Sequence, residues 1–200
     1  IHFPKNQDQL AQAQYRMKFE ELFFVQLQLG LKKLHRKQQL KGIPFPELGH
    51  HFNSFFHNHL PFPLTEAQKR VVREIRTDLK SEAQMNRLLQ GDVGSGKTIV
   101  AVLCMLMALD NGMQATLVAP TEILAQQHFN SINELLKPLD IQVGLLTGSV
   151  KKSARTPLLN QLADGSLQIL IGTHAVLEQP VAFQQLGLAI VDEQHRFGVA

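Results

Sequence analysis

The octapeptide at 91–98, GDVGSGKT, constrains the fold of this chain more than any other stretch. It follows a short apolar run, Leu88-Leu89, and leads into an unbroken apolar run at 99–109. Glycines let the backbone turn tightly, and a helix that begins directly after the turn points its N–H groups and the positive end of its dipole into the loop. The pattern therefore predicts a strand, a phosphate-binding loop and a buried helix, in that order.

The chemistry of this loop predicts a nucleoside triphosphate as its ligand. Lys97 is placed to reach the β- and γ-phosphates, and the hydroxyl of Thr98 is placed to ligate Mg²⁺. Backbone N–H groups of a glycine-rich turn supply the remaining contacts to the anionic oxygens. The nucleotide-binding residues expected from the motif are Gly91, Asp92, Gly94, Ser95, Gly96, Lys97 and Thr98.

A pair of acidic residues near the end of the sequence completes the expected site. Asp192 and Glu193 follow an apolar run at 188–191 that is typical of a buried strand, and ligands of open α/β sheets bind at the carboxyl ends of the strands. Asp192 can hold Mg²⁺ through water, and Glu193 can polarise the attacking water as general base. Two adjacent acids also occur in solvated turns, but their place after an apolar strand favours a site. We therefore expect Lys97, Asp192 and Glu193 to be the catalytic residues of a nucleotide hydrolase.

From residue 64 onward, apolar runs alternate with segments of helical periodicity. Helices are expected at 65–79, 97–111, 122–136 and 152–163, and strands at 87–90, 115–119, 142–146, 168–171 and 188–191. Apolar strands separated by helices form a parallel sheet that is covered on both faces. The sequence therefore predicts an α/β domain over 63–200.

A different pattern occupies the first third of the sequence. Residues 8–41 contain no proline, and their apolar residues recur at helical spacing, which predicts one long helix or a helical hairpin. A proline-rich break at 61–63 follows, so we place the boundary between an N-terminal helical segment, 1–62, and the α/β domain there. Basic residues gather at Lys32, Lys33, Arg36, Lys37 and Lys41. Such a stripe can follow a phosphate backbone or can be a solvated helix face, and the sequence leaves both open.

Composition argues against several classes of protein. No apolar run reaches the roughly 18 residues of a membrane span, and the sequence does not start with a secretory signal pattern, so we expect no membrane partner. The single cysteine, Cys104, lies inside the apolar run, which fits a buried residue in a reducing compartment and predicts a cytoplasmic protein. His50, His51, His57 and His59 alternate with phenylalanines, which favours packing over a metal site.

The residues that follow Asp192 connect the site to a known family. Residues 192–195 spell D-E-Q-H, and this signature resembles that of superfamily-two nucleic-acid helicases and translocases. Further segments resemble motifs of that family in the same order: LTEAQ at 64–68, APTEILAQQH at 119–128, TGS at 147–149 and GTHA at 172–175. The resemblance implies that 63–200 is the first of two RecA-like motor domains, and that it is incomplete here.

The same resemblance implies roles for further residues. Gln68 would recognise the adenine of ATP, and Gln194 and His195 would couple the nucleotide state to the DNA face. Three loops would hold the DNA backbone through N–H groups and hydroxyls, which carries no sequence preference. The DNA-binding residues implied in this way are Pro120, Thr121, Glu122, Thr147, Gly148, Ser149, Gly172, Thr173 and His174.

A narrower resemblance is to the RecG branch-migration helicases. The strings GDVGSGKT, APTEILAQQH, GTHA and DEQHRFGV are similar to theirs, and the N-terminal stretch that starts with IHFP is similar to the exit from their wedge domain and its linking helix. This resemblance implies ATP-driven translocation on duplex DNA, which remodels stalled replication forks and Holliday junctions in DNA repair and recombination. It also implies that the wedge and second motor domains belong to the same protein. Because the second motor domain would supply an arginine finger, we expect these 200 residues alone to bind ATP weakly and to hydrolyse it at a negligible rate.

Two other functions are compatible with the phosphate loop. A transporter or partitioning ATPase would carry the same loop, but it would leave the TGS and GTHA segments unexplained. A catalytically silent scaffold is disfavoured by the intact Lys97, Thr98, Asp192 and Glu193. A test of whether DNA tightens nucleotide binding distinguishes these functions from a helicase.

Overall fold

A parallel sheet lies at the centre of the computed structural model, which describes residues 3–92 and 94–194 except for the side chains of 36–38. The sheet has four strands in the order β2-β3-β1-β4. They are β1 (Gln114–Val118), β2 (Val143–Leu146), β3 (Ile169–Gly172) and β4 (Leu186–Val191). The chain passes from β1 outward to β2, returns to β3 and then crosses to β4 on the other side of β1. Val118 lies beside Gly172 on one side and Val191 on the other, so the carboxyl ends of these strands share one edge.

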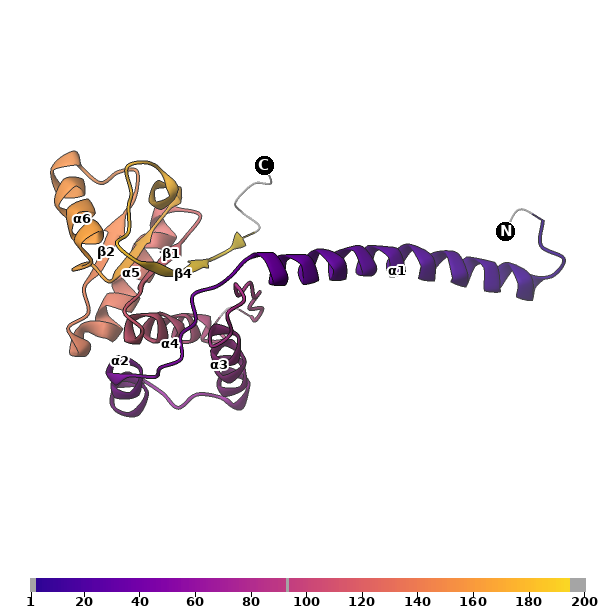
Figure 1. Ribbon diagram of the computed structural model, residues 1–200, viewed down its shortest axis with the longest axis horizontal. Coiled ribbons are helices and arrows are strands. Elements are labelled where there is room, and N and C mark those ends of the chain that lie inside the picture. Colours follow the sequence, from indigo (N-terminus) through magenta and orange to yellow (C-terminus); the bar gives the residue numbers. More distant parts are fainter. Residues whose placement is uncertain (1–2, 93, 195–200) are drawn as a thin grey trace.

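Helices cover both faces of this sheet (Figure 1). The helices of the packed unit are α2 (His50–Ser54), the π-helix η1 (Phe55–His59), α3 (Glu66–Leu79), α4 (Lys97–Asp110), α5 (Glu122–Leu136), η2 (Lys137–Leu139), α6 (Lys152–Asp164) and η3 (His174–Leu177). Leu117 and Ile171 point to the face that packs against α4 and α5. Val118 and Leu170 point to the other face and pack with Leu162 of α6. Successive strand residues face opposite sides of a sheet, which is why neighbours in the sequence enter two separate clusters.

The predicted fold class, a RecA-like P-loop parallel sheet with helices on both faces and an N-terminal helical segment, is confirmed. Most expected helices and strands are present, with ends that shift by one or two residues. Within the described part of the chain, no helix combines the length and the apolar character of a membrane span.

The helix that follows the phosphate loop, α4, is almost wholly enclosed. Every residue from Ile99 to Leu109 is buried except Ala101, because the helix lies between the sheet on one side and α2 and α3 on the other. Burial raises the pKa of the Cys104 thiol to about 12, so the thiol stays neutral and acts as a small apolar side chain. This confirms the prediction of a buried helix.

The short helix α2 docks on the far end of α4 through one carboxylate. Asp110, whose side chain is 1% exposed, accepts hydrogen bonds from the backbone N–H groups of Gly49, His51 and Phe52 at 2.8 to 3.0 Å. Its Oδ1 also lies 3.0 Å from His51 Nδ1. These backbone donors belong to the start of α2, so Asp110 caps a helix that is remote in the sequence.

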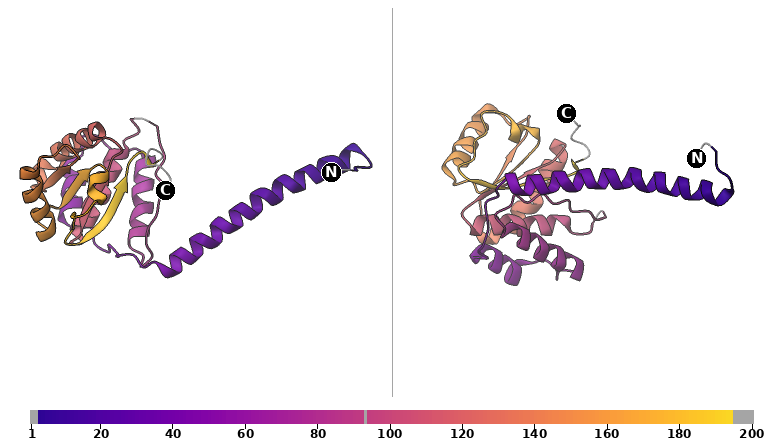
Figure 2. Two further views of the ribbon diagram at one scale, coloured as in Figure 1. Left: turned by 90° about the horizontal axis from the view of Figure 1, so that it is seen from above. Right: turned by 45° about the vertical axis from the view of Figure 1, so that its right-hand side comes forward.

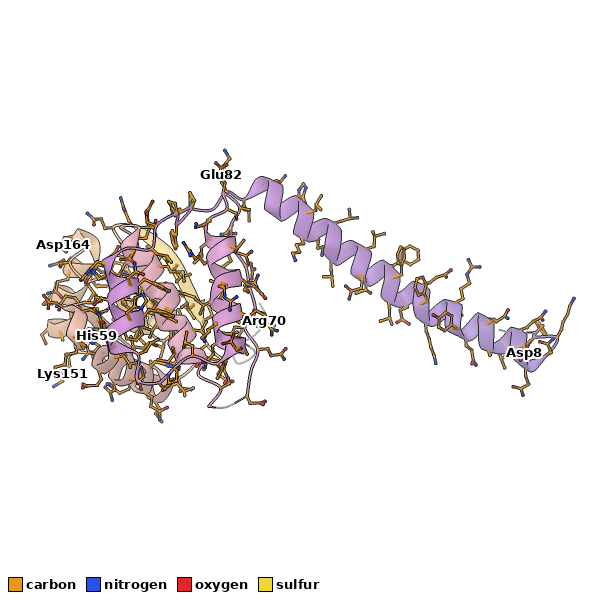
Figure 3. The ribbon with its side chains drawn as sticks, turned by 90° about the horizontal axis from the view of Figure 1, so that it is seen from below. Asp8, His59, Arg70, Glu82, Lys151 and Asp164 are labelled. Atoms are coloured by element: carbon orange, nitrogen blue, oxygen red, sulfur yellow. The ribbon has the colours of Figure 1, made fainter. Side chains whose placement is uncertain are left out.

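The N-terminal segment forms one helix rather than a hairpin. α1 (Gln7–Gln39) spans 33 residues and extends away from the packed unit (Figures 1 and 2). Its side chains extend outward around the helix, with Asp8 near the far end (Figure 3). After the helix, the backbone N–H of Gly42 donates to the carbonyl of Glu82 at 2.7 Å, which fixes the chain beside the end of α3.

The prediction of a strand at 87–90 is wrong, because these residues form no strand in the structure. Arg87 pairs with Glu74 and Asp78 of α3, at 2.7 Å in each case, and this holds the segment against the helix. Leu88 is 74% exposed, and only the other leucine packs on the core. A segment with one partly buried side chain lacks the apolar faces that a central strand of a parallel sheet requires.

The packed unit reaches back to Phe45, ahead of the boundary expected at 61–63. Phe45, Phe52 and Phe55 are buried in the same cluster as the residues of α4. The part that stands outside the core is therefore α1 and the residues around it.

Candidate nucleotide site and nucleic-acid interface

The phosphate loop has the backbone conformation that its glycines allow. Gly94 and Gly96 have φ angles of 79° and 78°, in the left-handed region that residues with a side chain rarely adopt. α4 begins at Lys97 directly after this turn, so its first N–H groups and the positive end of its dipole face the loop. Lys97 Nζ donates to the backbone carbonyls of Gly91 and Asp92 at 2.7 and 2.8 Å, which keeps the ammonium group within the loop.

This set of groups fits a nucleoside triphosphate with magnesium. A lysine ammonium, a glycine-rich turn and the start of a helix of 14 residues together attract and orient phosphate oxygens. Thr98 lies in the first turn of that helix. Its hydroxyl and the carboxylate of Asp192 are hard oxygen ligands of the kind that Mg²⁺ prefers. The residues present therefore fit ATP and Mg²⁺.

Gln68 makes contacts that the sequence did not predict. Its amide oxygen accepts from the backbone N–H of Thr65 at 2.9 Å, and its amide nitrogen donates to the carbonyl of Ser95 at 2.9 Å. The first of these bonds belongs to the capping box that starts α3. The second ties α3 to the phosphate loop, and a side chain added at Gly96 would contact the same amide. Gln68 thus supports the loop in this structure, and its part in adenine recognition stays a prediction.

Asp192, directly after β4, is held by two contacts, one with β1 and one with α5. Its backbone N–H donates to the carbonyl of Val118, the last residue of β1, at 2.9 Å. Its Oδ2 lies 2.7 Å from Nε2 of His128 on α5. Both side chains are largely buried, at 28% exposed for Asp192 and 19% for His128. The strand order changes direction between β1 and β4, and such switch points are where open α/β sheets bind ligands.

The residues beyond Asp192 lie at the same edge. Glu193 is exposed and has a φ of 50°, a left-handed conformation that is uncommon for a residue with a side chain and that occurs at functional sites. Gln194 is exposed as well. His195, the other residue expected to act in coupling, lies outside the described residues.

A groove of about 360 Å³ runs between the start of α5 and the loop that follows β2. Its lining residues are Glu122, Ile123, Gln126, Gln127, Thr147 and Ser149. Glu122 Oε1 accepts from the backbone N–H of Ser149 at 3.0 Å, and Thr147 Oγ1 lies 3.0 Å from Ser149 Oγ. The structure therefore brings together two of the three loops that the resemblance implies in DNA binding.

The third loop follows β3 at the same edge of the sheet. Gly172 packs so closely on the carbonyl of Leu146 that a side chain there would clash. The side chains of Thr147 and Thr173 are buried, whereas His174 is 73% exposed and lies 3.5 Å from Glu178 Oε1. Pro120 is half-buried, and the exposed members of the expected DNA-binding set are Thr121, Glu122, Gly148, Ser149 and His174. Thr121 also caps α5, because its hydroxyl accepts from the N–H of Leu124 at 3.3 Å.

Sequence reasoning missed several residues of this edge. His128 was part of the string APTEILAQQH, but the string does not say which strand end the imidazole faces. Ile123, Gln126 and Gln127 line the groove because helical spacing brings them to the side of α5 that faces the loop after β2. The signal available in the sequence was their spacing: these residues follow Glu122 by one, four and five positions, which places all of them on one side of a helix.

The comparisons with known proteins agree with this geometry. A family described as "DEAD/DEAH box helicase" matches residues 65–200. The chain belongs to this helicase family. The matched stretch contains the phosphate loop, the groove and the acidic pair.

Curated relatives of this helicase chain include three named "ATP-dependent DNA helicase RecG". The protein from Synechocystis is 48% identical over 199 residues, which is 100% of this chain and 24% of the relative. Those from Streptococcus pneumoniae and Bacillus subtilis are 47% and 46% identical, again over 100% of this chain and over 29% of each relative. The resemblance to RecG is confirmed, and the chain spans about a quarter of the length of these relatives.

Two solved structures of helicases are similar to this chain. A structure described as RecG bound to a three-way DNA junction matches 99% of this chain and 27% of that chain, with 43% identity and a TM-score of 0.87. A hypothetical ATP-dependent RNA helicase from Sulfolobus tokodaii matches 74% of this chain with 19% identity and a TM-score of 0.55. The second likeness shows the fold alone.

Proposed function

We propose that these residues are the nucleotide-binding half of an ATP-dependent DNA helicase of the RecG kind. The observation that supports this most is the shared edge of the sheet. Asp192 at the end of β4 is hydrogen-bonded both to the end of β1 and to α5, and α5 lines the groove beside the loop after β2. A nucleotide site and a nucleic-acid groove that share α5 suit a protein that converts hydrolysis into movement along DNA.

The chemical roles follow from the groups present. Lys97 neutralises charge on the β- and γ-phosphates, and the α4 N-terminus and the loop N–H groups orient them. Thr98 and Asp192 would hold the magnesium ion, which when bound would neutralise charge on the phosphate oxygens. Glu193 accepts the proton of the attacking water, because a carboxylate at this edge is the available base. Gln68 reads adenine in addition to its contact with the loop.

The groove holds the phosphate backbone of DNA in this proposal. Within 120–122, 147–149 and 172–174, the exposed Thr121, Gly148, Ser149 and His174 offer hydroxyl, backbone and imidazole groups for phosphate contacts that are independent of base sequence. The names of the relatives and the three-way junction in the matched structure support helicase action at DNA junctions. Within this proposal, the protein drives branch migration at stalled forks and Holliday junctions in DNA repair and recombination. A wedge domain and a second motor domain of the same cytoplasmic protein complete the helicase. Gln194 and His195 couple the nucleotide site to the DNA groove.

The variant Glu193→Gln tests the assigned base. In the full-length protein, we expect ATP turnover to fall by about 10²- to 10⁴-fold because the amide cannot accept the proton of water. Binding of a fluorescent ATP analogue should stay near the wild-type affinity, since the phosphate loop is unchanged. The exposed Glu134 of α5 offers a matched control, and Glu134→Gln should hydrolyse ATP normally. Turnover that survives in Glu193→Gln would show that another group is the base.

A further inference from the structure

His128 lies on α5, the helix that lines the groove, and contacts Asp192, the predicted magnesium ligand. Its Nε2 lies 2.7 Å from Asp192 Oδ2, and both side chains are largely buried. A hydrogen bond of this length between partly buried side chains restricts the rotamers of both residues. The backbone of Asp192 is fixed as well, through its N–H to Val118, so the direction of the carboxylate is set by the β1–α5 unit.

The chemistry of this pair assigns the donor. A carboxylate that holds magnesium is ionised and only accepts hydrogen bonds, so in the proposed site His128 would donate through Nε2. The contact engages Oδ2, and the remaining acceptor capacity of the Asp192 carboxylate would be available to magnesium. Outer partners of this kind orient metal-ligating side chains, and their loss typically costs about 10–100-fold in metal affinity or activity.

The position of His128 on α5 adds a second consequence. The helix begins at Glu122, which accepts from Ser149 N–H across the groove at 3.0 Å, and Gln126 and Gln127 line that groove directly before His128. A helix moves as a rigid element, so a shift of its first turns when the groove is filled would move the imidazole and, with it, the carboxylate of Asp192.

We propose that His128 is a positioning residue that orients Asp192 for magnesium and thereby joins the magnesium site to the groove. The inference rests on the proposed function, because Asp192 is a magnesium ligand only in that proposal. It assigns the contact between α5 and β4 as the path by which the groove affects the nucleotide site. No proton transfer by His128 is involved.

The test compares two substitutions of similar bulk in the full-length protein. His128→Gln keeps an N–H donor at about the reach of Nε2, whereas His128→Leu fills the space without a donor. The measurement is the magnesium concentration that half-saturates binding of a fluorescent ATP analogue. We expect the leucine variant to raise this concentration about 10–100-fold and the glutamine variant to stay within about threefold of wild type. The DNA-stimulated kcat should fall in the leucine variant while the affinity for DNA is retained.

Two controls make the result specific. Ser131→Ala changes an exposed residue of the same helix and should leave the magnesium dependence unchanged. In an Asp192→Asn background, His128→Leu should have no further effect, because the carboxylate that it positions is already removed.

Equal magnesium dependence in the glutamine and leucine variants would overturn the proposal. A full effect of His128→Leu in the Asp192→Asn background would overturn it too, since the histidine would then act elsewhere. Thermal melting identifies a variant that does not fold, and His128→Ala then replaces His128→Leu in the same comparison. A wild-type protein whose nucleotide binding and hydrolysis do not respond to magnesium would contradict the proposed function itself, and this inference with it.

Discussion

Gln68 and His128 each use a side-chain hydrogen bond to hold a residue of the candidate nucleotide site. Their partners, Ser95 and Asp192, are 27 and 64 residues away in the sequence. Such contacts depend on how α3 and α5 pack, so no local pattern could predict them. The phosphate loop could be predicted from sequence because its residues are consecutive and its turn requires glycine at defined positions, as the left-handed φ angles confirm.

The variant Gln68→Ala separates the two roles of this residue. If its main role is to support the loop, binding of ATP and GTP should weaken together, by roughly fivefold to tenfold, as expected for one lost hydrogen bond of about 1 kcal/mol. If adenine recognition dominates, ATP binding should weaken and GTP binding should not. Binding of fluorescent ATP and GTP analogues measures both. The structure favours the first result, and unchanged affinity for both nucleotides would contradict both roles.

At the scale of elements, the helices from α3 to α6 and most strands could be predicted because their apolar periodicity reflects faces that are buried. The periodicity of α1 also predicted a helix, but its apolar side chains, such as Phe19 and Leu22, are exposed. The segment at 87–90 could not, since its two leucines suggested a strand while Arg87 holds it to Glu74 and Asp78 of α3. The docking of α2 on α4 could not be predicted from the sequence either. It depends on Asp110, a residue that the sequence presents only as the polar end of an apolar run.

Removal of the Asp110 carboxylate should loosen α2 without unfolding the sheet. In Asp110→Ala, the backbone N–H groups of Gly49, His51 and Phe52 lose their acceptor, which should cost about 2–4 kcal/mol locally. Amide hydrogen exchange at 49–60 should accelerate by roughly a hundredfold, because local opening requires that much less free energy. Asp164→Ala, at the exposed end of α6, is the matched control. Unchanged exchange at 49–60 in Asp110→Ala would show that Asp110 does not hold the helix.

At the scale of the whole molecule, the structure places the edge of the packed unit near Phe45 rather than at the prolines of 61–63. The prolines do interrupt the helical pattern, as the sequence indicated. However, three phenylalanines ahead of them, Phe45, Phe52 and Phe55, are each at most 6% exposed. The burial of an aromatic side chain depends on the surface that it meets in the folded chain, so composition alone could not show that these three residues join the core.

Shortened chains test this limit. A chain that starts at residue 44 should fold and should bind ATP analogues like the 200-residue chain, because it keeps the whole core. A chain that starts at residue 63 loses three buried phenylalanines, each worth about 3–5 kcal/mol, and should not fold cooperatively. Urea unfolding followed by circular dichroism measures both. Equal stability of the two chains would place the limit of the folded unit at the prolines after all.

In the function that we propose, one edge of the sheet binds ATP and DNA and couples the two. The most direct measurement is the rate of ATP hydrolysis by the full-length protein, with and without junction, duplex or single-stranded DNA, at fixed salt. We expect slow hydrolysis without DNA and a manyfold increase on addition of junction or duplex DNA, because DNA in the groove acts on the nucleotide site through α5. A rate that is the same with and without every DNA would contradict it.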